Sequence, residues 1–181
     1  MRDVILHAGT FGRGFSGKTF LAKEMSKQYW RGHSVKSLVL DPNLEEWGPQ
    51  AFVTDDQELF WDMVWHREKQ CALFIEESSE TIARDSEKTS LFTRVRHRGH
   101  RLHVSGHSGM SLTPEQRNQL HVLFLFQQTP KAAKAWSETF MDERILQSTT
   151  LLQYEFLHCV LWGDNGRNLV KKCKLTVPWA I

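Results

Sequence analysis

Apolar residues in this chain form short continuous runs that alternate with longer stretches in which apolar positions recur every three or four residues. Continuous runs are typical of buried strands, and the longer period is typical of helices with one apolar face. On this basis the sequence predicts strands over residues 3–9, 35–40, 51–53, 71–75, 102–105 and 121–126. It predicts helices over residues 20–30, 55–69, 89–98 and 130–140, with shorter helical turns at 44–47, after Pro114 and at 142–147.

The alternation of strands and helices is typical of an α/β fold with a parallel sheet. Residues 71–75 are continuously apolar, as in a central strand that is covered on both sides. Two final apolar stretches, 154–162 and 168–175, flank Asp164-Asn165-Gly166, which is favourable for a hairpin turn. We therefore expect one domain over residues 1–181. Its fold would be α/β, with a mainly parallel central sheet, helices on both faces and a C-terminal β-hairpin.

Composition and charge narrow the class of protein. The 181 residues are 40% hydrophobic and 24% charged, which is ordinary for a globular protein. The net charge of +2 is too small to indicate nucleic-acid binding by itself. We expect no membrane-spanning segment and no signal peptide, because no apolar run is long enough and the N-terminus leads directly into a strand. Cys71, Cys159 and Cys173 lack metal-ligand spacing and are expected to be reduced.

The strongest motif lies between the first predicted strand and the first predicted helix. It has the spacing G-x-x-x-x-G-K-[ST] of a phosphate-binding loop, formed by Gly12, Arg13, Gly14, Phe15, Ser16, Gly17, Lys18 and Thr19. Glycines let backbone N–H groups turn inward around phosphate oxygens, and the start of a helix adds its positive dipole end. Lys18 would contact the β and γ phosphates of ATP, and the Thr19 hydroxyl would ligate Mg²⁺. The motif therefore predicts nucleotide binding.

Two carboxylates, Glu76 and Glu77, follow the apolar run at 71–75. In nucleoside triphosphatases, the first acid after such a strand holds Mg²⁺ and the second activates the attacking water. Aspartate is usual at the first position, so Glu76 departs from that pattern. The alternative is a pair of exposed acids at the start of a loop. Their position after a good phosphate loop favours the catalytic interpretation.

A basic segment from Arg94 to His103 holds four arginines and three histidines. It could supply an arginine finger, in the same chain or to a neighbouring subunit, or it could face nucleic-acid phosphates. A solvated helix face is the alternative for most of its residues. Polar side chains also follow two predicted strands, with His107 after the fourth and Gln127 after the fifth. Each could sense the γ phosphate, and each could equally be an ordinary turn residue.

Taken together, these motifs resemble the FtsK–HerA superfamily of DNA-pumping P-loop ATPases, and within it the small genome-packaging ATPases of membrane-containing and related viruses. The resemblance spans roughly residues 4–175. It rests on the phosphate loop, the strand ending Leu40-Asp41-Pro42-Asn43, the acid pair, Arg96-His97, the segment 114–118 and the polar end of the fifth strand. It implies Arg96 and Arg117 as finger candidates and places His107 in the position of a polar sensor that is often Gln.

The resemblance implies an ATP-hydrolysing motor that uses Mg²⁺ and translocates double-stranded DNA, packaging a viral genome. It also implies a homo-oligomeric ring of five or six subunits, capsid vertex proteins as further partners, and a location in the host cytoplasm or at a capsid vertex of the virion. Because the sequence has no long apolar run, we expect no insertion into a membrane. Lys131, Lys134 and Arg101 are candidates for DNA contact. Two alternatives share the loop: a small-molecule or nucleoside kinase, and a nucleotide-dependent assembly scaffold with little turnover.

Overall fold

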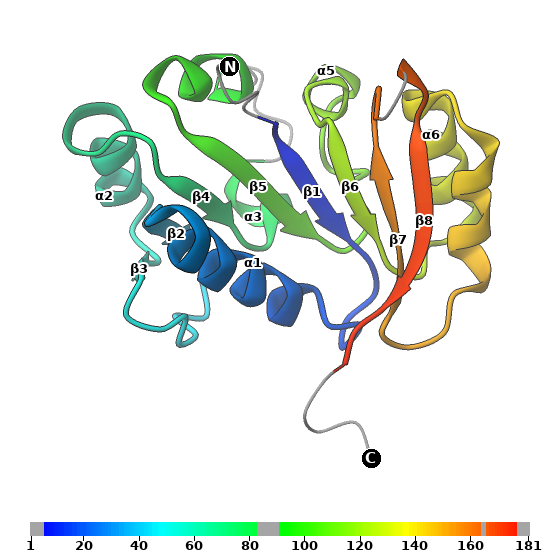
Figure 1. Cartoon of the computed structure of the whole chain (residues 1–181), viewed down its shortest axis with the longest axis horizontal. Coiled ribbons are helices and arrows are strands. Elements are labelled where there is room, and N and C mark those ends of the chain that lie inside the picture. Colours follow the sequence, from blue (N-terminus) through cyan, green and yellow to red (C-terminus); the bar gives the residue numbers. More distant parts are fainter. Residues whose placement is uncertain (1–5, 83–90, 164–165, 177–181) are drawn as a thin grey trace.

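One sheet of eight strands organises the part of the chain that the structure, a computed structural model, describes: residues 6–82, 91–163 and 166–176. The strand order is β3-β2-β4-β5-β1-β6-β7-β8 (Figure 1). Neighbouring strands are parallel from β3 to β6, and the last two pairs, β6–β7 and β7–β8, are antiparallel. The strands are β1 (Ala8–Phe11), β2 (Ser37–Leu40), β3 (Ala51–Thr54), β4 (Ala72–Ile75), β5 (Arg101–Gly106), β6 (Val122–Leu125), β7 (Glu155–Val160) and β8 (Leu169–Lys174).

Helical segments connect most of the parallel strands, as is usual for parallel pairing. They are α1 (Lys18–His33), α2 (Gln57–Asp62), α3 (Ser78–Thr81), α5 (Pro114–Asn118) and α6 (Pro130–Phe140). The π-helix η1 (Met63–Arg67) continues α2, and the 3₁₀ helices η2 (Val95–Arg98) and η3 (Glu143–Thr150) precede β5 and β7. Residues 41–50, which join β2 to β3, contain no helix, so the helical turn predicted at 44–47 is wrong. None of the helices in the described ranges is long and apolar enough to cross a membrane.

The two faces of the sheet differ because successive side chains of a strand point to opposite sides. One face, here called the apolar face, carries Leu73, Ile75, Leu102 and Val104 from the central strands β4 and β5. Trp136 of α6 packs on the same face, where its ring stacks against the ring of Phe11 with 5.0 Å between ring centroids. The opposite face, here called the α1 face, is covered by α1 near β2 and β4, as Figure 1 shows.

The fold class expected from the sequence is confirmed, including the mainly parallel sheet, helices on both faces and the C-terminal hairpin formed by β7 and β8. The bounds of the first strand were predicted less well, since β1 covers Ala8–Phe11 where the sequence predicts 3–9, and residues 3–5 lie outside the described ranges. Gly9 fits a central strand because a Cβ there would lie only 2.4 Å from the Phe11 ring. A glycine therefore stands inside this strand for a packing reason.

Candidate nucleotide-binding site

The phosphate loop predicted at residues 12–19 joins the carboxyl end of β1 to the start of α1. Two of its glycines are required by the geometry. A Cβ on Gly12 would lie 2.4 Å from Cβ of Phe126, and Gly17 has a φ of +100° with the Leu175 side chain 2.7 Å from where its Cβ would be. The first turn of α1 holds no acidic residue, so nothing negative there opposes an anion at the helix start.

Lys18 is a buried cation within this loop, with 7% of its surface exposed. Its Nζ donates a hydrogen bond to the Arg13 carbonyl at 3.0 Å, and burial lowers the pKa of its ammonium. Among the described residues, no carboxylate lies within ion-pair distance of it. A buried charge without a matched anion is costly, and a phosphate group in the loop would supply that anion.

Glu76 and Thr19 meet at the end of β4, beside the start of α1. The Thr19 hydroxyl donates a hydrogen bond to Glu76 Oε2 at 3.1 Å. Burial raises the pKa of Glu76 to about 7, although the bond from Thr19 opposes this shift. A bound cation would favour the ionised carboxylate.

These two side chains offer hard oxygen ligands that fit Mg²⁺. The described residues contain no cluster of three or more His, Cys, Asp or Glu side chains that could hold a metal ion. Mg²⁺ commonly needs only one or two protein ligands when phosphates and waters complete its shell. The donor set of Thr19 and Glu76 is therefore suited to Mg²⁺ that arrives with a nucleotide.

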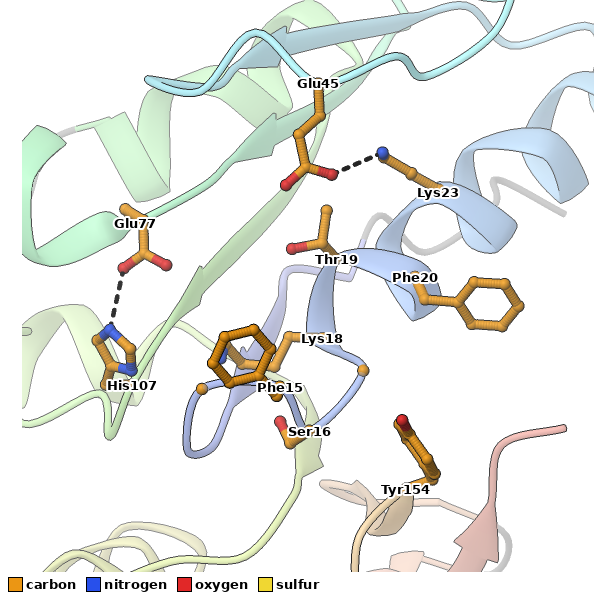
Figure 2. A pocket seen from close by; sticks show the side chains of 12 residues that line it. Phe15, Ser16, Lys18, Thr19, Phe20, Lys23, Glu45, Glu77, His107 and Tyr154 are labelled. Atoms are coloured by element: carbon orange, nitrogen blue, oxygen red, sulfur yellow. Dashed lines mark hydrogen bonds and ion pairs between the residues drawn. The ribbon is translucent and has the colours of Figure 1, made fainter. Parts of the chain in front are cut away.

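Glu77 differs from its neighbour because it reaches the open part of the site. It has a φ of +46°, which turns the chain sharply at the end of β4 and separates its side chain from the buried Glu76. Glu77 Oε2 lies 3.6 Å from Nε2 of His107, which follows β5 (Figure 2). Both residues line a cavity of about 390 Å³ over the phosphate loop. A carboxylate in that position can accept a proton from a water held near the phosphates.

The structure does not bring all the predicted site residues together. Gln127 follows β6 at the same edge of the sheet as the loop but is outside the cavity lining. Arg96 and Arg117 lie at the opposite edge, because η2 and α5 come before the strands they lead into. Arg96 donates to the Thr93 carbonyl, while Arg117 donates to the Leu112 carbonyl and lies 6.0 Å from the Trp136 ring centroid. Neither arginine lines the cavity over the loop of its own chain.

Some residues that line the cavity were not expected from the sequence: Phe20, Lys23, Glu45 and Tyr154. Glu45 is positioned by the buried Asp41, whose carboxylate accepts from the backbone N–H of Asn43 and Glu45. Glu45 Oε2 then pairs with Lys23 Nζ at 2.8 Å. The strand ending at Asp41 was recognised as a motif, but no local signal connects it to a lysine on α1.

No protein-family model matches this sequence, and no curated protein does either. Solved structures do match. The genome-packaging NTPase B204 of Sulfolobus turreted icosahedral virus 2 in complex with AMPPCP superposes with a TM-score of 0.75 at 20% identity, covering 94% of this chain and 97% of that one. The crystal structure of B204, described as the DNA-packaging ATPase of Sulfolobus turreted icosahedral virus, gives a TM-score of 0.73 at 22% identity, with coverage of 94% and 97%.

A more distant match is the N-terminal domain of zonular occludens toxin from Neisseria meningitidis, with a TM-score of 0.58 at 12% identity and coverage of 97% and 96%. The cytoplasmic domain of the type VII secretion ATPase EccC from Thermomonospora curvata matches with a TM-score of 0.61 at 10% identity. It covers 95% of this chain and 24% of that one. These likenesses show that the chain shares the fold of these proteins.

Proposed function

We propose that this chain is an ATP hydrolase that translocates double-stranded DNA, and that it packages a viral genome. One observation carries the proposal. A single edge of the sheet holds a phosphate loop with the buried cation Lys18, an oxygen pair suited to Mg²⁺, and a more accessible carboxylate, Glu77. These are the parts that hydrolysis of a nucleoside triphosphate requires.

Each residue has a separate task in this reaction. The loop N–H groups and Lys18 hold the β and γ phosphates and neutralise charge that develops on them. Thr19 and Glu76 would hold Mg²⁺, which would neutralise negative charge on the phosphates. Glu77 orients a water molecule for attack on the γ phosphorus and accepts its proton. His107, 3.6 Å from Glu77, holds that carboxylate on the cavity side and is our candidate for the polar sensor.

We propose that a second copy of the chain supplies an arginine finger to this site. Neither Arg96 nor Arg117 lines the cavity over the loop of its own chain, so each is a candidate for a neighbouring molecule. The proposal includes a homo-oligomeric ring of five or six subunits with nucleotide at the interfaces. The B204 structures, whose fold this chain shares, are those of genome-packaging NTPases and support DNA as the translocated partner.

The proposal places the protein in the host cytoplasm or at a capsid vertex of the virion. Contact with DNA is assigned to the exposed lysines of α6, Lys131 and Lys134, with Arg101 at the start of β5 as a third candidate. A groove or pore that collects such cations would bind the DNA backbone without regard to its sequence.

The test is the rate of phosphate release from Mg·ATP with and without double-stranded DNA, combined with the mass of the protein in the presence of ATP. We expect DNA to accelerate release and ATP to favour an assembly larger than a dimer. The variant Lys18→Ala should lose hydrolysis by roughly a hundredfold or more, because it removes a charge that stabilises the transition state. Turnover that ignores DNA while a small acceptor molecule becomes phosphorylated would identify a kinase instead.

A further inference from the structure

The cavity over the phosphate loop has two chemically different ends. Glu77 and His107 lie at one end, and Phe20 and Tyr154 lie at the other, with Lys18 between them (Figure 2). The first end carries groups that can act on a water or a phosphate. The second end carries two flat aromatic side chains, contributed by α1 and by the turn that leads into β7.

The chemistry of the two ends of the cavity determines the direction in which a nucleotide would lie in it. The loop and Lys18 fix the phosphates, and the γ phosphate must point toward Glu77 for the attacking water to be activated. The nucleoside must then leave the loop on the other side, toward Phe20 and Tyr154. Aromatic side chains bind nucleobases by stacking, because each base presents a flat π face.

Tyr154 is held firmly in its place beside the loop. It has a φ of +65°, and its carbonyl accepts a hydrogen bond from the backbone N–H of Leu175 at 2.9 Å. Gly17 of the phosphate loop packs directly under this turn, since a Cβ there would lie 3.4 Å from the Tyr154 ring and 2.7 Å from Leu175. The two ends of the C-terminal hairpin, just before β7 and just after β8, are therefore tied together against the loop.

The hairpin has support from the sheet as well. Phe126 follows β6, is fully buried and lies beside Gly17, where its ring would be 3.8 Å from a Cβ. The same ring packs against Phe156 of β7, with 5.3 Å between ring centroids. Because the hairpin that carries Tyr154 is packed in this way, the Tyr154 side chain needs little reordering to bind a ligand. This lowers the entropic cost of binding.

We propose that the base of the nucleotide stacks on Tyr154 and that the C-terminal hairpin forms the nucleoside-binding wall of the site. This inference rests on the proposed function and deepens it, because it assigns the nucleoside half of the ligand. It also gives the hairpin a task that neither the phosphate loop nor the acid pair provides. Phe20 of α1 lines the same end of the cavity and bounds the space for the base.

The experiment compares two ligands, Mg·ATP and Mg·tripolyphosphate, which share the phosphate chain but differ in the nucleoside. Dissociation constants are measured by calorimetric titration for the wild type and for Tyr154→Ala, Tyr154→Phe and Trp162→Ala. Trp162 is a matched control, because it is an exposed aromatic residue at the far end of β7. Thermal unfolding of each variant checks that the fold is retained.

We expect Tyr154→Ala to weaken ATP binding about tenfold, as the loss of one base stack does, and to leave tripolyphosphate binding unchanged. Tyr154→Phe keeps the ring and should keep the ATP affinity, and Trp162→Ala should affect neither ligand. Equal weakening of both ligands by Tyr154→Ala would overturn the inference, because Tyr154 would then only shape the loop. Unchanged ATP affinity would overturn it too.

The proposed function fails in a different way. A wild-type protein that binds neither ligand, or a Lys18→Ala variant that binds both as well as the wild type does, would refute the phosphate site itself and the base stack with it. A failure confined to Tyr154 leaves the phosphate site standing. Measuring both ligands therefore distinguishes a failure of the proposed base stack on Tyr154 from a failure of the phosphate site.

Discussion

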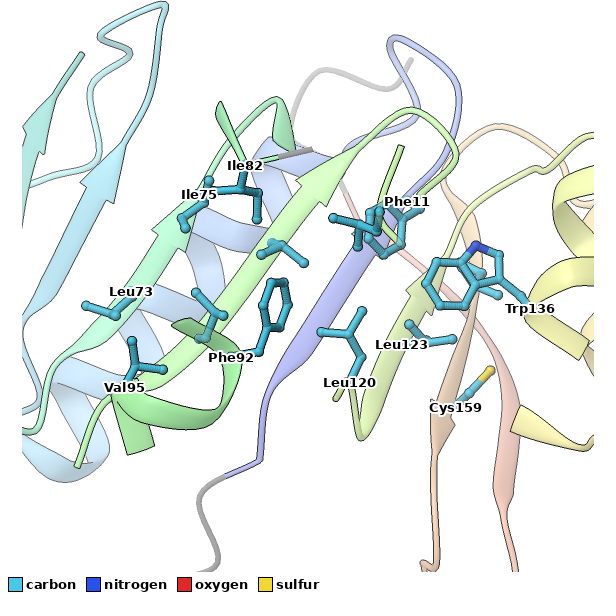
Figure 3. Close-up of a cluster of buried hydrophobic side chains, with 14 of the residues drawn as sticks. Phe11, Leu73, Ile75, Ile82, Phe92, Val95, Leu120, Leu123, Trp136 and Cys159 are labelled. Carbon is cyan, nitrogen blue, oxygen red and sulfur yellow. The ribbon is translucent and has the colours of Figure 1, made fainter. Parts of the chain in front are cut away.

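The apolar face and the α1 face of the sheet are made by the same strands, yet they differ in chemistry. On the apolar face, Leu73 and Ile75 are nearly inaccessible and belong to a cluster of buried apolar side chains (Figure 3). Val104 belongs to the same cluster. The alternate residues of the same strands point to the α1 face and include Glu76 and His103, which are also buried. Buried polar groups are costly unless they are satisfied, so the α1 face carries chemistry at the expense of stability.

His103 is an example of a buried polar group on the α1 face that lowers the stability of the fold. Its ring stacks on Phe74 with 4.7 Å between centroids, and its Nε2 lies 3.0 Å from the Tyr29 hydroxyl. Burial lowers the pKa of His103 to about 3. The native protein therefore holds this imidazole neutral at pH values where the unfolded chain would bind a proton.

The first prediction tests the apolar face. Leu73→Ala should reduce the free energy of unfolding by about 4 kcal/mol, because it leaves a cavity in the middle of the sheet. The dissociation constant of ATP for the folded protein should not change, since Leu73 points away from the α1 face. Urea unfolding and a titration of ATP measure the two quantities. Leu169→Ala, at a half-exposed position of β8, is the control and should stay within about 0.5 kcal/mol of the wild type.

If Leu73→Ala weakened ATP binding as much as it weakened folding, the two faces could not be treated as separate in function. If the control lost as much stability as Leu73→Ala, the central strands would have no special weight in the core.

The second prediction tests the α1 face through pH. The unfolded chain protonates His103 near its ordinary pKa of about 6.5 while the native chain does not, so stability falls as the pH is lowered below that value. Between about pH 7 and about pH 4 this one residue should account for a loss of about 3 kcal/mol. The double variant His103→Phe with Tyr29→Phe should lack this part of the acid sensitivity. The measurement is urea unfolding across the pH range.

Tyr29→Phe alone serves as the control, because it removes the hydroxyl partner and keeps the imidazole. Its stability should depend on pH as steeply as that of the wild type. A double variant with the wild-type pH dependence would show that other groups, such as the buried His7 with its pKa lowered to about 4, cause the acid sensitivity.

Much of the fold could be predicted because its signals are local. The apolar run ending at Ile75 and the phosphate-loop spacing each lie within a few residues, and parallel strands then place their carboxyl ends at one edge. This reasoning correctly placed Glu76 beside Thr19. It was less accurate for β1, which continues through Thr10 and Phe11 although the pattern predicts that the strand ends at Gly9.

The rest of the site depends on contacts between distant segments. Tyr154 reaches the loop only because β7 and β8 fold back beside β6, and the sequence around it has no nucleotide-binding motif. Arg96 and Arg117 were expected as finger candidates from the family resemblance, which does not say where their side chains lie relative to the loop. Their use in a neighbouring subunit remains a prediction, to be tested by mixing Arg96→Ala with Lys18→Ala chains.

The central claim is that the site at the carboxyl ends of the parallel strands hydrolyses ATP, with Glu77 as the general base. Phosphate release at saturating Mg·ATP, measured for the wild type and for Glu77→Gln together with the amount of ATP bound, tests it most directly. We predict that Glu77→Gln binds ATP as the wild type does and releases phosphate at least about a hundredfold more slowly, the usual cost of losing a general base. Phosphate release by Glu77→Gln at the wild-type rate would contradict the claim.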